Sequence, residues 1–377
     1  MPQKNKNSED SAFKNWINKD LVQRISAHLQ KHSSQFDFKS FEKVGGKLQN
    51  LEMKPRVQLI REALHKSLPA DYKKSLAILL KATLSPAKNI KPLKGFDLWP
   101  FTDFVQTYGL KNLEESLKAL AEFTKLFTSE YAVRPFLIHH QEETLRYFHE
   151  WMESDNVHLR RLASEGSRPR LPWGEQLKAF IKDPAPTLPI LEALKYDDEL
   201  YVRKSVANHL NDISKDHPEL AVKISKKWLK ECPKEHKAKI DWIVRHGLRT
   251  LIKKGNKPAL ELLGYAGSGK VEVKDLKISA KKVRIGDHLE FSFDLHTAKG
   301  MAVMVDYIIH HKKSNGSHSP KVFKLTSKEF EKKSVTPIRK KHSFKIVTTR
   351  TYYPGVHHLE IMVNGEVRAR ISFSLRE

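Results

Sequence analysis

Apolar side chains recur at helical spacing through most of the first 265 residues. The pattern is clearest in four segments: 110–127, 188–194, 202–213 and 220–229. Such spacing is typical of amphipathic helices that bury one face against their neighbours. We therefore predict that residues 1–265 form a mainly α-helical domain.

The pattern changes after the glycine- and serine-rich segment 264–270. From Leu289 onward, apolar and polar residues alternate with the period of two that is typical of strands. The dipeptide Asn364-Gly365 separates two alternating runs and predicts a type I′ hairpin. About seven short strands predict an all-β, immunoglobulin-like sandwich. We place this sandwich at 271–377 and a Gly/Ser hinge at 266–270.

A short pattern, aliphatic-Arg-basic, repeats within the helical region. Its copies are centred on Arg160, Arg203 and Arg245, and Arg134 belongs to a further copy at a shorter interval. The longer interval falls within the roughly 40–47 residue period of HEAT and armadillo helix pairs. The pattern predicts a HEAT-like solenoid in which these four arginines form one basic, phosphate-binding stripe. The alternative is that each arginine only caps or salt-bridges a neighbouring repeat.

The composition indicates which partner such a stripe would bind. The chain has 68 Lys and Arg residues against 44 Asp and Glu residues, a formal net charge of +24. An excess of this size favours nucleic acid as the partner. No apolar run approaches the ~20 residues of a membrane span, and the N-terminus lacks the apolar core of a signal peptide. With Cys232 as the only cysteine, we expect a cytoplasmic, monomeric, nucleic-acid-binding protein without disulfides.

The segment from His158 to Trp173 concentrates charge and helix-breaking residues. It begins as a helical turn, which a glycine and two prolines then end. Four arginines accompany one carboxylate, Glu165, and the segment closes on Trp173. This combination indicates a surface that binds a phosphate backbone and presents one carboxylate and one aromatic ring. The alternatives are a solvated carboxylate at Glu165 and a core anchor at Trp173.

Other patterns point away from nucleotide and metal chemistry. Residues 264–270 have the Gly-x4-Gly-Lys spacing of a phosphate loop, but Val271 stands where Ser or Thr is required and a strand follows. The histidines show no His-Glu-x-x-His or Cys/His ligand spacing, so we expect no metal site. The Gly-x-Ser-x-Gly signature of a serine nucleophile is absent.

The stretch Arg160-Arg-Leu-Ala-Ser-Glu-Gly-Ser-Arg-Pro-Arg-Leu-Pro-Trp173 resembles the signature of AlkC-type DNA alkylation repair glycosylases. These belong to the HEAT-like repeat superfamily that also contains AlkD. The similarity extends over the helical region, and the tail resembles the immunoglobulin-like domain of one AlkC branch. The resemblance implies excision of 3-methyladenine and 3-methylcytosine from duplex DNA, without a cofactor and without flipping the base into a pocket.

The resemblance also implies roles for individual residues. Glu165 and Trp173 occupy the carboxylate and aromatic positions of the motif, and Glu130 and Asp212 correspond to further catalytic carboxylates. The ordinary alternative for Glu130 is a carboxylate that stabilises a helix N-terminus. The predicted DNA-binding set combines the motif, the repeat and the basic loops of the sandwich, and comprises Arg134, Arg160, Arg161, Arg168, Arg170, Arg203, Lys204, Arg245, Lys312, Lys313, Arg339, Lys340 and Lys341.

The chemistry implied by the resemblance is simple. A 3-methylated base is already cationic, leaves as a neutral base and needs no general acid. The remaining barrier is positive charge on the deoxyribose, which a carboxylate about 4 Å away stabilises by up to ~4 kcal/mol at an effective dielectric near 20. We therefore expect a monofunctional glycosylase acting on duplex DNA with alkylated bases. The alternatives are a non-catalytic HEAT-repeat scaffold that binds DNA structure and an adaptor for an acidic protein.

Overall fold

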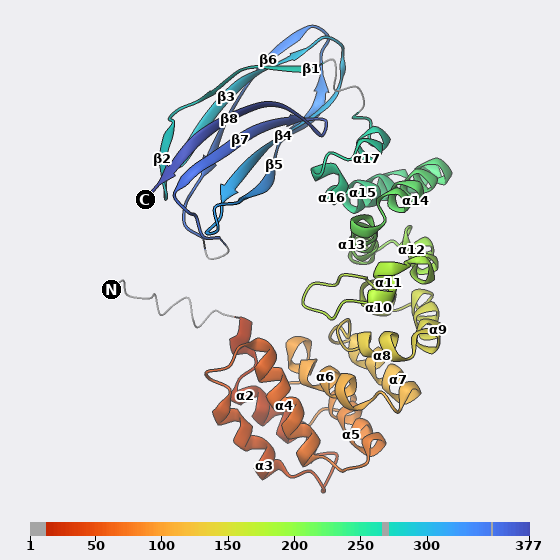
Figure 1. The fold of residues 1–377 in the computed structure, drawn as a ribbon. Coiled ribbons are helices and arrows are strands. Elements are labelled where there is room, and N and C mark those ends of the chain that lie inside the picture. The colour runs from red at the N-terminus through yellow and green to blue at the C-terminus, as the bar shows by residue number, and fades with distance from the viewer. Residues whose placement is uncertain (1–12, 266–270, 348–349) are drawn as a thin grey trace. The chain divides into compact units, whose positions relative to one another are not determined.

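The computed structural model describes residues 13–265, 271–347 and 350–377 (Figure 1). The predicted Gly/Ser hinge at 266–270 lies outside these residues. The chain forms two compact units: Met1–Asp216 with Cys232–Ile243, and His217–Glu231 with Val244–Glu377. The change from helix to strand falls where the sequence predicted it, whereas the compact units divide within the helical region.

Helices account for the first part of the chain, as predicted. The described residues contain sixteen α-helices: α2 (Lys19–Gln30), α3 (Phe38–Glu42), α4 (Met53–Ser67), α5 (Tyr72–Leu84), α6 (Trp99–Tyr108), α7 (Leu113–Thr124), α8 (Arg134–His139), α9 (Gln141–Met152), α10 (Val157–Gly166), α11 (Lys178–Lys182), α12 (Leu188–Leu194), α13 (Leu200–Asp216), α14 (Pro218–Glu231), α15 (Lys237–Gly247), α16 (Arg249–Lys253) and α17 (Lys257–Leu262). Short 3-10 helices are η1 (Phe13–Trp16), η2 (Lys43–Lys47), η3 (Gly95–Leu98), η4 (Ala185–Thr187) and η5 (Lys234–His236).

Within the first unit, α8 to α13 pack on their neighbours in the manner of stacked repeats (Figure 1). Helix α10 begins at the N-cap Asn156, whose side chain accepts a hydrogen bond from the backbone of His158. It ends at Gly166, where a Cβ would lie 2.7 Å from the side chain of Val133. The missing side chain lets α10 approach the start of α8 closely.

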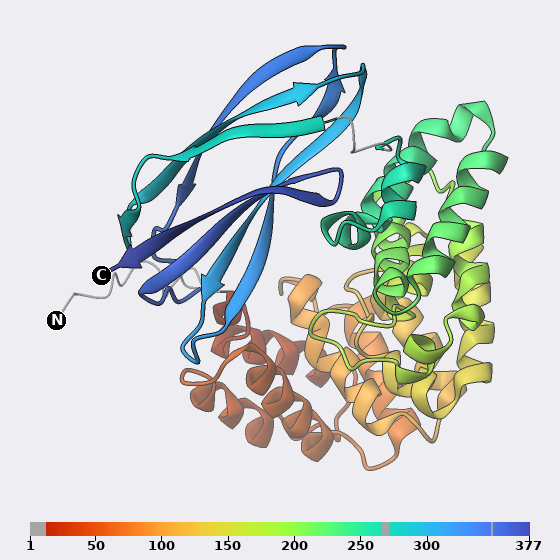
Figure 2. The ribbon, with the colours of Figure 1, turned by 45° about the horizontal axis from the view of Figure 1, so that its top comes forward.

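The chain between α10 and α11 leaves the helix stack as a loop in both views (Figures 1 and 2). This loop, residues 167–177, carries the prolines predicted to end the helix. It is closed at its base by the backbone hydrogen bond from Leu177 to Pro169 (3.1 Å). A second bond, from Gly174 to Leu171 (3.2 Å), turns its tip. We call it the tryptophan loop, because Trp173 lies at that tip.

The second unit contains the predicted sandwich, with eight strands in the described residues rather than about seven. The strands are β1 (Val271–Ile278), β2 (Lys282–Arg284), β3 (His288–Thr297), β4 (Met301–Lys312), β5 (His318–Phe330), β6 (Ser334–Ser343), β7 (Gly355–Val363) and β8 (Glu366–Arg376). They form a three-stranded sheet, β1-β3-β6, and a five-stranded sheet, β2-β8-β7-β4-β5. The two sheets face one another (Figure 2).

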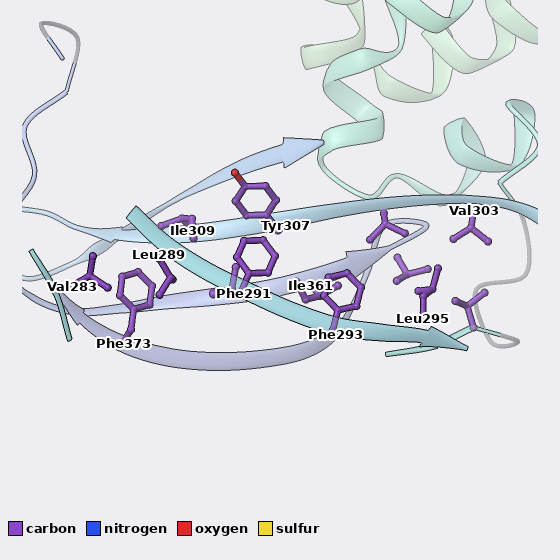
Figure 3. Packing of buried hydrophobic residues seen from close by; sticks show 14 of the residues in the cluster. Val283, Leu289, Phe291, Phe293, Leu295, Val303, Tyr307, Ile309, Ile361 and Phe373 are labelled. Atoms are coloured by element: carbon purple, nitrogen blue, oxygen red, sulfur yellow. The ribbon is translucent and has the colours of Figure 1, made fainter. Parts of the chain in front are cut away.

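The alternating residues fill the space between the two sheets, as predicted. Phe291 and Phe293 of β3 meet Tyr307 of β4 and Ile361 of β7 in one buried cluster (Figure 3). The hairpin between β7 and β8 turns at Asn364 and Gly365, which have φ angles of 44° and 81°. Two successive positive φ angles are those of the predicted type I′ turn. The observed class is therefore the predicted one, helical repeats followed by an all-β sandwich.

The predicted basic loops of the sandwich require a correction. Arg339, Lys340 and Lys341 lie within strand β6, which pairs with β3 at the edge of its sheet. Lys312 ends strand β4, so that of these five residues only Lys313 lies in a turn. Alternation in β6 is weak, which is why the segment resembled a loop.

In the part of the chain that the structure describes, no helix has both the length and the apolar character needed to cross a membrane.

Candidate active site

A row of five charged side chains, alternating in sign, crosses three successive repeats of the first unit. In order along the row they are Glu130, Arg161, Glu165, Arg168 and Asp212. Glu130 lies in the turn before α8, Glu165 in the last turn of α10, and Asp212 in α13. We call these residues the ion-pair row. The structure thus brings together all three carboxylates that were predicted to be catalytic.

Arg161 joins the first two carboxylates of the row. Its guanidinium contacts Glu130 Oε2 through Nη1, and its Nη2 lies 3.5 Å from Glu165 Oε1. Thr128 adds a hydrogen bond from its hydroxyl to Glu130 Oε2 (2.8 Å). Burial alone would lower the pKa of Arg161, but the charges of Glu165 and Glu130 outweigh it and raise the pKa. Arg161 therefore stays a cation that holds both carboxylates in place.

Arg168, at the start of the tryptophan loop, joins the next two. Its Nη1 lies 2.6 Å from Glu165 Oε1 and its Nε lies 2.8 Å from Asp212 Oδ2. The side chain of Asp212 is fully buried, and its other oxygen accepts a hydrogen bond from Lys215 (2.8 Å). Through Arg168, the row therefore links the tryptophan loop both to α10 and to α13.

Helix α13 holds Glu165 through polar residues on its buried face. The hydroxyl of Ser205 lies 2.6 Å from Glu165 Oε2 and 2.9 Å from the hydroxyl of Ser164. One turn further, His209 lies 3.0 Å from the carbonyl of Ser164 through Nδ1. Burial lowers the pKa of His209 to about 4, so this imidazole is neutral at pH 7. Both oxygens of Glu165 thus have fixed partners.

Two tyrosines flank the row. Burial, with the charge of Glu130 adding to it, raises the pKa of Tyr131 to about 12. The second is Tyr201, whose ring centroid lies 5.0 Å from the guanidinium carbon of Arg161. This is a cation–π contact, which helps to orient the arginine.

Trp173 is presented to solvent. The residue is 69% exposed, so the alternative that it anchors the loop in the core is wrong. Its φ angle of 66° lies in the left-handed region, which a residue with a Cβ adopts only when its surroundings enforce it. An exposed indole in an enforced conformation is suited to contact with a ligand.

The predicted arginine stripe needs a correction at Arg134. This side chain is fully buried and donates hydrogen bonds to the carbonyls of Gly166 (2.9 Å) and Glu175. Burial lowers the pKa of its guanidinium to about 10. A buried guanidinium with backbone partners cannot contact a phosphate, so the prediction that Arg134 binds DNA is wrong.

Arg160 and Arg203 have matching roles within the stack. Each donates through Nη1 to the carbonyls of the residues five and six positions earlier, at 2.9 and 3.0 Å for Arg160 and at 2.8 and 2.6 Å for Arg203. Arg160 also forms a two-point pair with Asp197 of the next repeat. The geometry favours the alternative stated above, in which the repeated arginine braces the stack.

The other predicted DNA-binding residues lie at the surface. Arg170 is paired with Asp216 through Nε (2.7 Å) and Nη2 (2.8 Å). Lys204 is exposed on α13, and Arg245 is exposed on α15 with Nη1 3.2 Å from the hydroxyl of Tyr265. On β6, Arg339 and Lys340 are exposed. Lys312 donates to the carbonyl of Pro354 and Lys341 pairs with Glu290, while Lys313 is exposed in its turn.

Several residues of the site escaped the sequence analysis. Ser205 and His209 look like ordinary helix residues, although their spacing with Asp212 along α13 places all three on one helical face. Tyr131 is adjacent to the predicted Glu130. Nothing in the sequence singles out Lys54, whose Nζ lies 2.6 Å from the carbonyl of Trp173.

The chemistry open to the row follows from its charges. In the described residues no group of three or more His, Cys, Asp or Glu side chains is arranged to hold a metal ion. The carboxylates are instead fixed by arginines and by Ser205. Carboxylates oriented in advance stabilise positive charge without reorganising during a reaction. The row therefore suits a reaction in which a cation develops.

The chain is similar to known proteins in both its helical part and its sandwich. The family described as DNA alkylation repair enzyme matches residues 106–251, which include the whole ion-pair row. The C-terminal Ig-like domain of the uncharacterised protein YhaZ matches residues 272–377. The YhaZ protein of Bacillus subtilis is 44% identical over 325 residues, covering 86% of this chain and 88% of that protein. An alkylpurine DNA glycosylase AlkC of Pseudomonas fluorescens, solved bound to DNA with an abasic-site analogue, is 38% identical, with a TM-score of 0.87, and covers 97% of this chain and 100% of that one.

The chain belongs to the AlkC family. The sequence resemblance is thereby confirmed over both the helical part and the sandwich. In this AlkC-family protein, the motif that ends at Trp173 supplies three of the five members of the row, Arg161, Glu165 and Arg168. Its first residue, Arg160, braces the stack. The motif thus combines a structural element with the site.

Proposed function

We propose that this protein is a DNA glycosylase that excises cationic N3-methylated bases, 3-methyladenine and 3-methylcytosine, from duplex DNA. The observation that carries the proposal is the ion-pair row together with the exposed Trp173, five residues beyond Arg168 of the row, in a chain similar over nearly its whole length to a protein named as an alkylpurine DNA glycosylase. The reaction hydrolyses the N-glycosidic bond and leaves an abasic site.

The leaving base needs no proton, because methylation at N3 has already made it cationic. As the bond breaks, its electron pair goes to the base, which leaves neutral, and positive charge develops on the deoxyribose. Glu165 is the proposed catalytic carboxylate that stabilises this charge and orients the attacking water. Glu130 and Asp212 are proposed to support it at either end of the row. The water adds its oxygen to the sugar carbon and releases one proton.

Trp173 is proposed to stack on the sugar or on the cationic base. An aromatic face next to a cation contributes ~0.5–2 kcal/mol. The indole can do this because it is exposed, and because a hydrogen bond from Arg134 to the carbonyl of Gly166 fixes the start of its loop. The proposed reaction does not require the methylated base to be flipped into a deep pocket.

Binding to duplex DNA is proposed to use exposed cations of both units. The set includes Lys204 and Arg245 of the helices and Arg339 and Lys340 of β6. Arg161, whose side chain keeps 15% of its surface exposed, is proposed to contact a phosphate next to the lesion while it remains paired in the row. Arg168 is buried between Glu165 and Asp212, so the prediction that it binds DNA is not carried forward, for the same reason as for Arg134. The excess of positive charge in the chain, +24, supports this partner.

The test is release of free 3-methyladenine and 3-methylcytosine from methylated duplex DNA, without added metal or nucleotide. Wild type and Glu165→Gln are assayed side by side, together with the affinity of both for the duplex. Release by wild type and loss of release in the variant, at equal affinity, support the proposal. Tight binding without release by wild type instead supports the non-catalytic scaffold.

A further inference from the structure

The tryptophan loop is clamped at its base by one buried side chain. Arg134 donates to the carbonyl of Gly166, just before the loop, and to that of Glu175, near its end. Gly174 lies directly on this clamp, since a Cβ there would be 3.2 Å from Arg134 Cδ. The two ends of the loop are therefore fixed relative to each other.

The tip of the loop is held differently. It borders a polar cavity of about 150 Å³, whose lining includes Trp99, Asp103, Tyr131 and Trp173. The indole is largely exposed, so apolar packing contributes little to its position. At the tip, Lys54 at the start of α4 donates from Nζ to the carbonyl of Trp173 at 2.6 Å.

This hydrogen bond is made to a residue whose backbone conformation is strained. Trp173 has a left-handed φ, so its backbone is not in the conformation it would prefer alone. An ammonium donor to its carbonyl favours the observed orientation of that peptide. The carbonyl carbon and the Cβ that carries the indole are both bonded to the Cα of Trp173, so a tether on the carbonyl restrains this Cα and, through it, the ring.

We propose that Lys54 is a positioning residue, which holds the peptide of Trp173 so that the indole meets the substrate in one orientation. This inference rests on the proposed function, and it assigns a role in the reaction to a helix outside the repeats that carry the ion-pair row. Lys54 does not touch the reacting atoms; it acts through Trp173.

The test compares Lys54→Met and Lys54→Arg with Lys66→Met, which removes an exposed lysine at the far end of the same helix. We expect the single-turnover excision rate of Lys54→Met to fall about tenfold, which corresponds to ~1.4 kcal/mol. Its affinity for duplex DNA should change by no more than about twofold, as for a group that acts in the transition state only. Lys54→Arg should recover most of the rate, and Lys66→Met should match wild type.

A second measurement reports the tether itself. With fluorotryptophan in place of the six tryptophans, the fluorine resonance of Trp173 is assigned by its loss in Trp173→Phe. It should shift or broaden in Lys54→Met and not in Lys66→Met. The inference is overturned by an unmoved resonance, by an unchanged rate, or by a rate loss that follows a loss of DNA affinity, which would make Lys54 a phosphate contact. If wild type itself releases no base, the proposed function fails and this inference with it; if wild type is active and Lys54→Met equals it, the inference alone fails.

Discussion

Replacing Glu165 by glutamine removes one buried negative charge and preserves the shape of the side chain. Glu165 is 5% exposed, so its surroundings are closer to a protein interior than to water. At a separation of about 4 Å and an effective dielectric near 20, a carboxylate and a developing cation interact by ~4 kcal/mol. Each ~1.4 kcal/mol is tenfold in rate, so excision should fall by about three orders of magnitude.

The expected effect on folding is much smaller. Glu165 Oε1 accepts a hydrogen bond from Arg168 and forms an ion pair with Arg161 at 3.5 Å, and Oε2 accepts from Ser205. A glutamine carbonyl can replace Oε1, and its amide can donate to Ser205, whose hydroxyl is free to rotate and accept. Arg161 and Arg168 then face a neutral carbonyl in place of a carboxylate, which weakens these bonds at a cost of ~1–2 kcal/mol. Arg168 keeps its second carboxylate partner, Asp212.

The assay measures release of 3-methyladenine from methylated duplex DNA under single-turnover conditions, with thermal unfolding and duplex affinity in parallel. Glu153→Gln is the matched control, because it makes the same substitution at an exposed carboxylate of the same unit. A folded Glu165→Gln protein that binds DNA and retains excision within about threefold of wild type would refute the electrostatic argument, since that ratio corresponds to less than ~1 kcal/mol.

Three further predictions concern pH, DNA binding and the sandwich. Burial lowers the pKa of His209 from 6.5 to about 4, so between pH 7 and pH 5 this group takes up a proton in the unfolded chain but not in the folded protein. The free energy of unfolding should therefore be ~2 kcal/mol lower at pH 5 than at pH 7 because of this group. Urea titrations at the two pH values measure this drop, which should be smaller in His209→Gln. The double variant of Arg339→Gln and Lys340→Gln should flatten the dependence of log affinity for duplex DNA on log salt by ~0.9 for each phosphate that it no longer neutralises; an identical slope in anisotropy titrations would remove β6 from the interface. Gly365 has a φ of 81°, and a Cβ there would lie 2.6 Å from the Cα of Gly255, so Gly365→Ala should lower the free energy of unfolding by ~1–3 kcal/mol. Thermal unfolding should show a smaller loss for Gly286→Ala, because Gly286 also has a positive φ but a Cβ there would meet no atom within 4 Å.

The sandwich was predictable because its signals are local. Alternation in β3 and the Asn364-Gly365 turn each depend on residues adjacent in sequence, and the structure confirms both. In β4 the predicted inward residues lie in the core, but the opposite face of this strand is buried as well. The edge strand β6 was missed because its outward face is exposed and basic, so that period two is hidden by charge. When the inward face of a strand is only partly apolar and partly buried, the sequence shows little of the alternation from which strands are predicted.

The roles of the arginines were not predictable from charge alone. Arg134 and Arg161 are both basic residues in the repeat region, yet one clamps a loop from the interior and the other belongs to the ion-pair row. Apart from Glu165, which is four residues from Arg161, their partners are 31 or more residues away in sequence, and some are backbone carbonyls. Sequence specifies that a guanidinium is present, whereas only the packing of helices decides whether it faces a carbonyl, a carboxylate or solvent.

The repeat itself explains where the chemistry lies. Arg160 and Arg203 occupy equivalent positions and make the same two backbone contacts, so what recurs along the chain is the brace between helices. The next position differs: Arg161 enters the row, while Lys204 is exposed. Five residues beyond each brace stands Glu165 in one repeat and Asn208 in the other. A feature that stabilises every repeat has to be the same in each, whereas a reaction needs its carboxylate only once. Residues that depart from the repeat pattern are therefore better candidates for the active site than residues that follow it. The recurring arginines Arg160 and Arg203, from which the stripe was inferred, instead stabilise the packing of the helices.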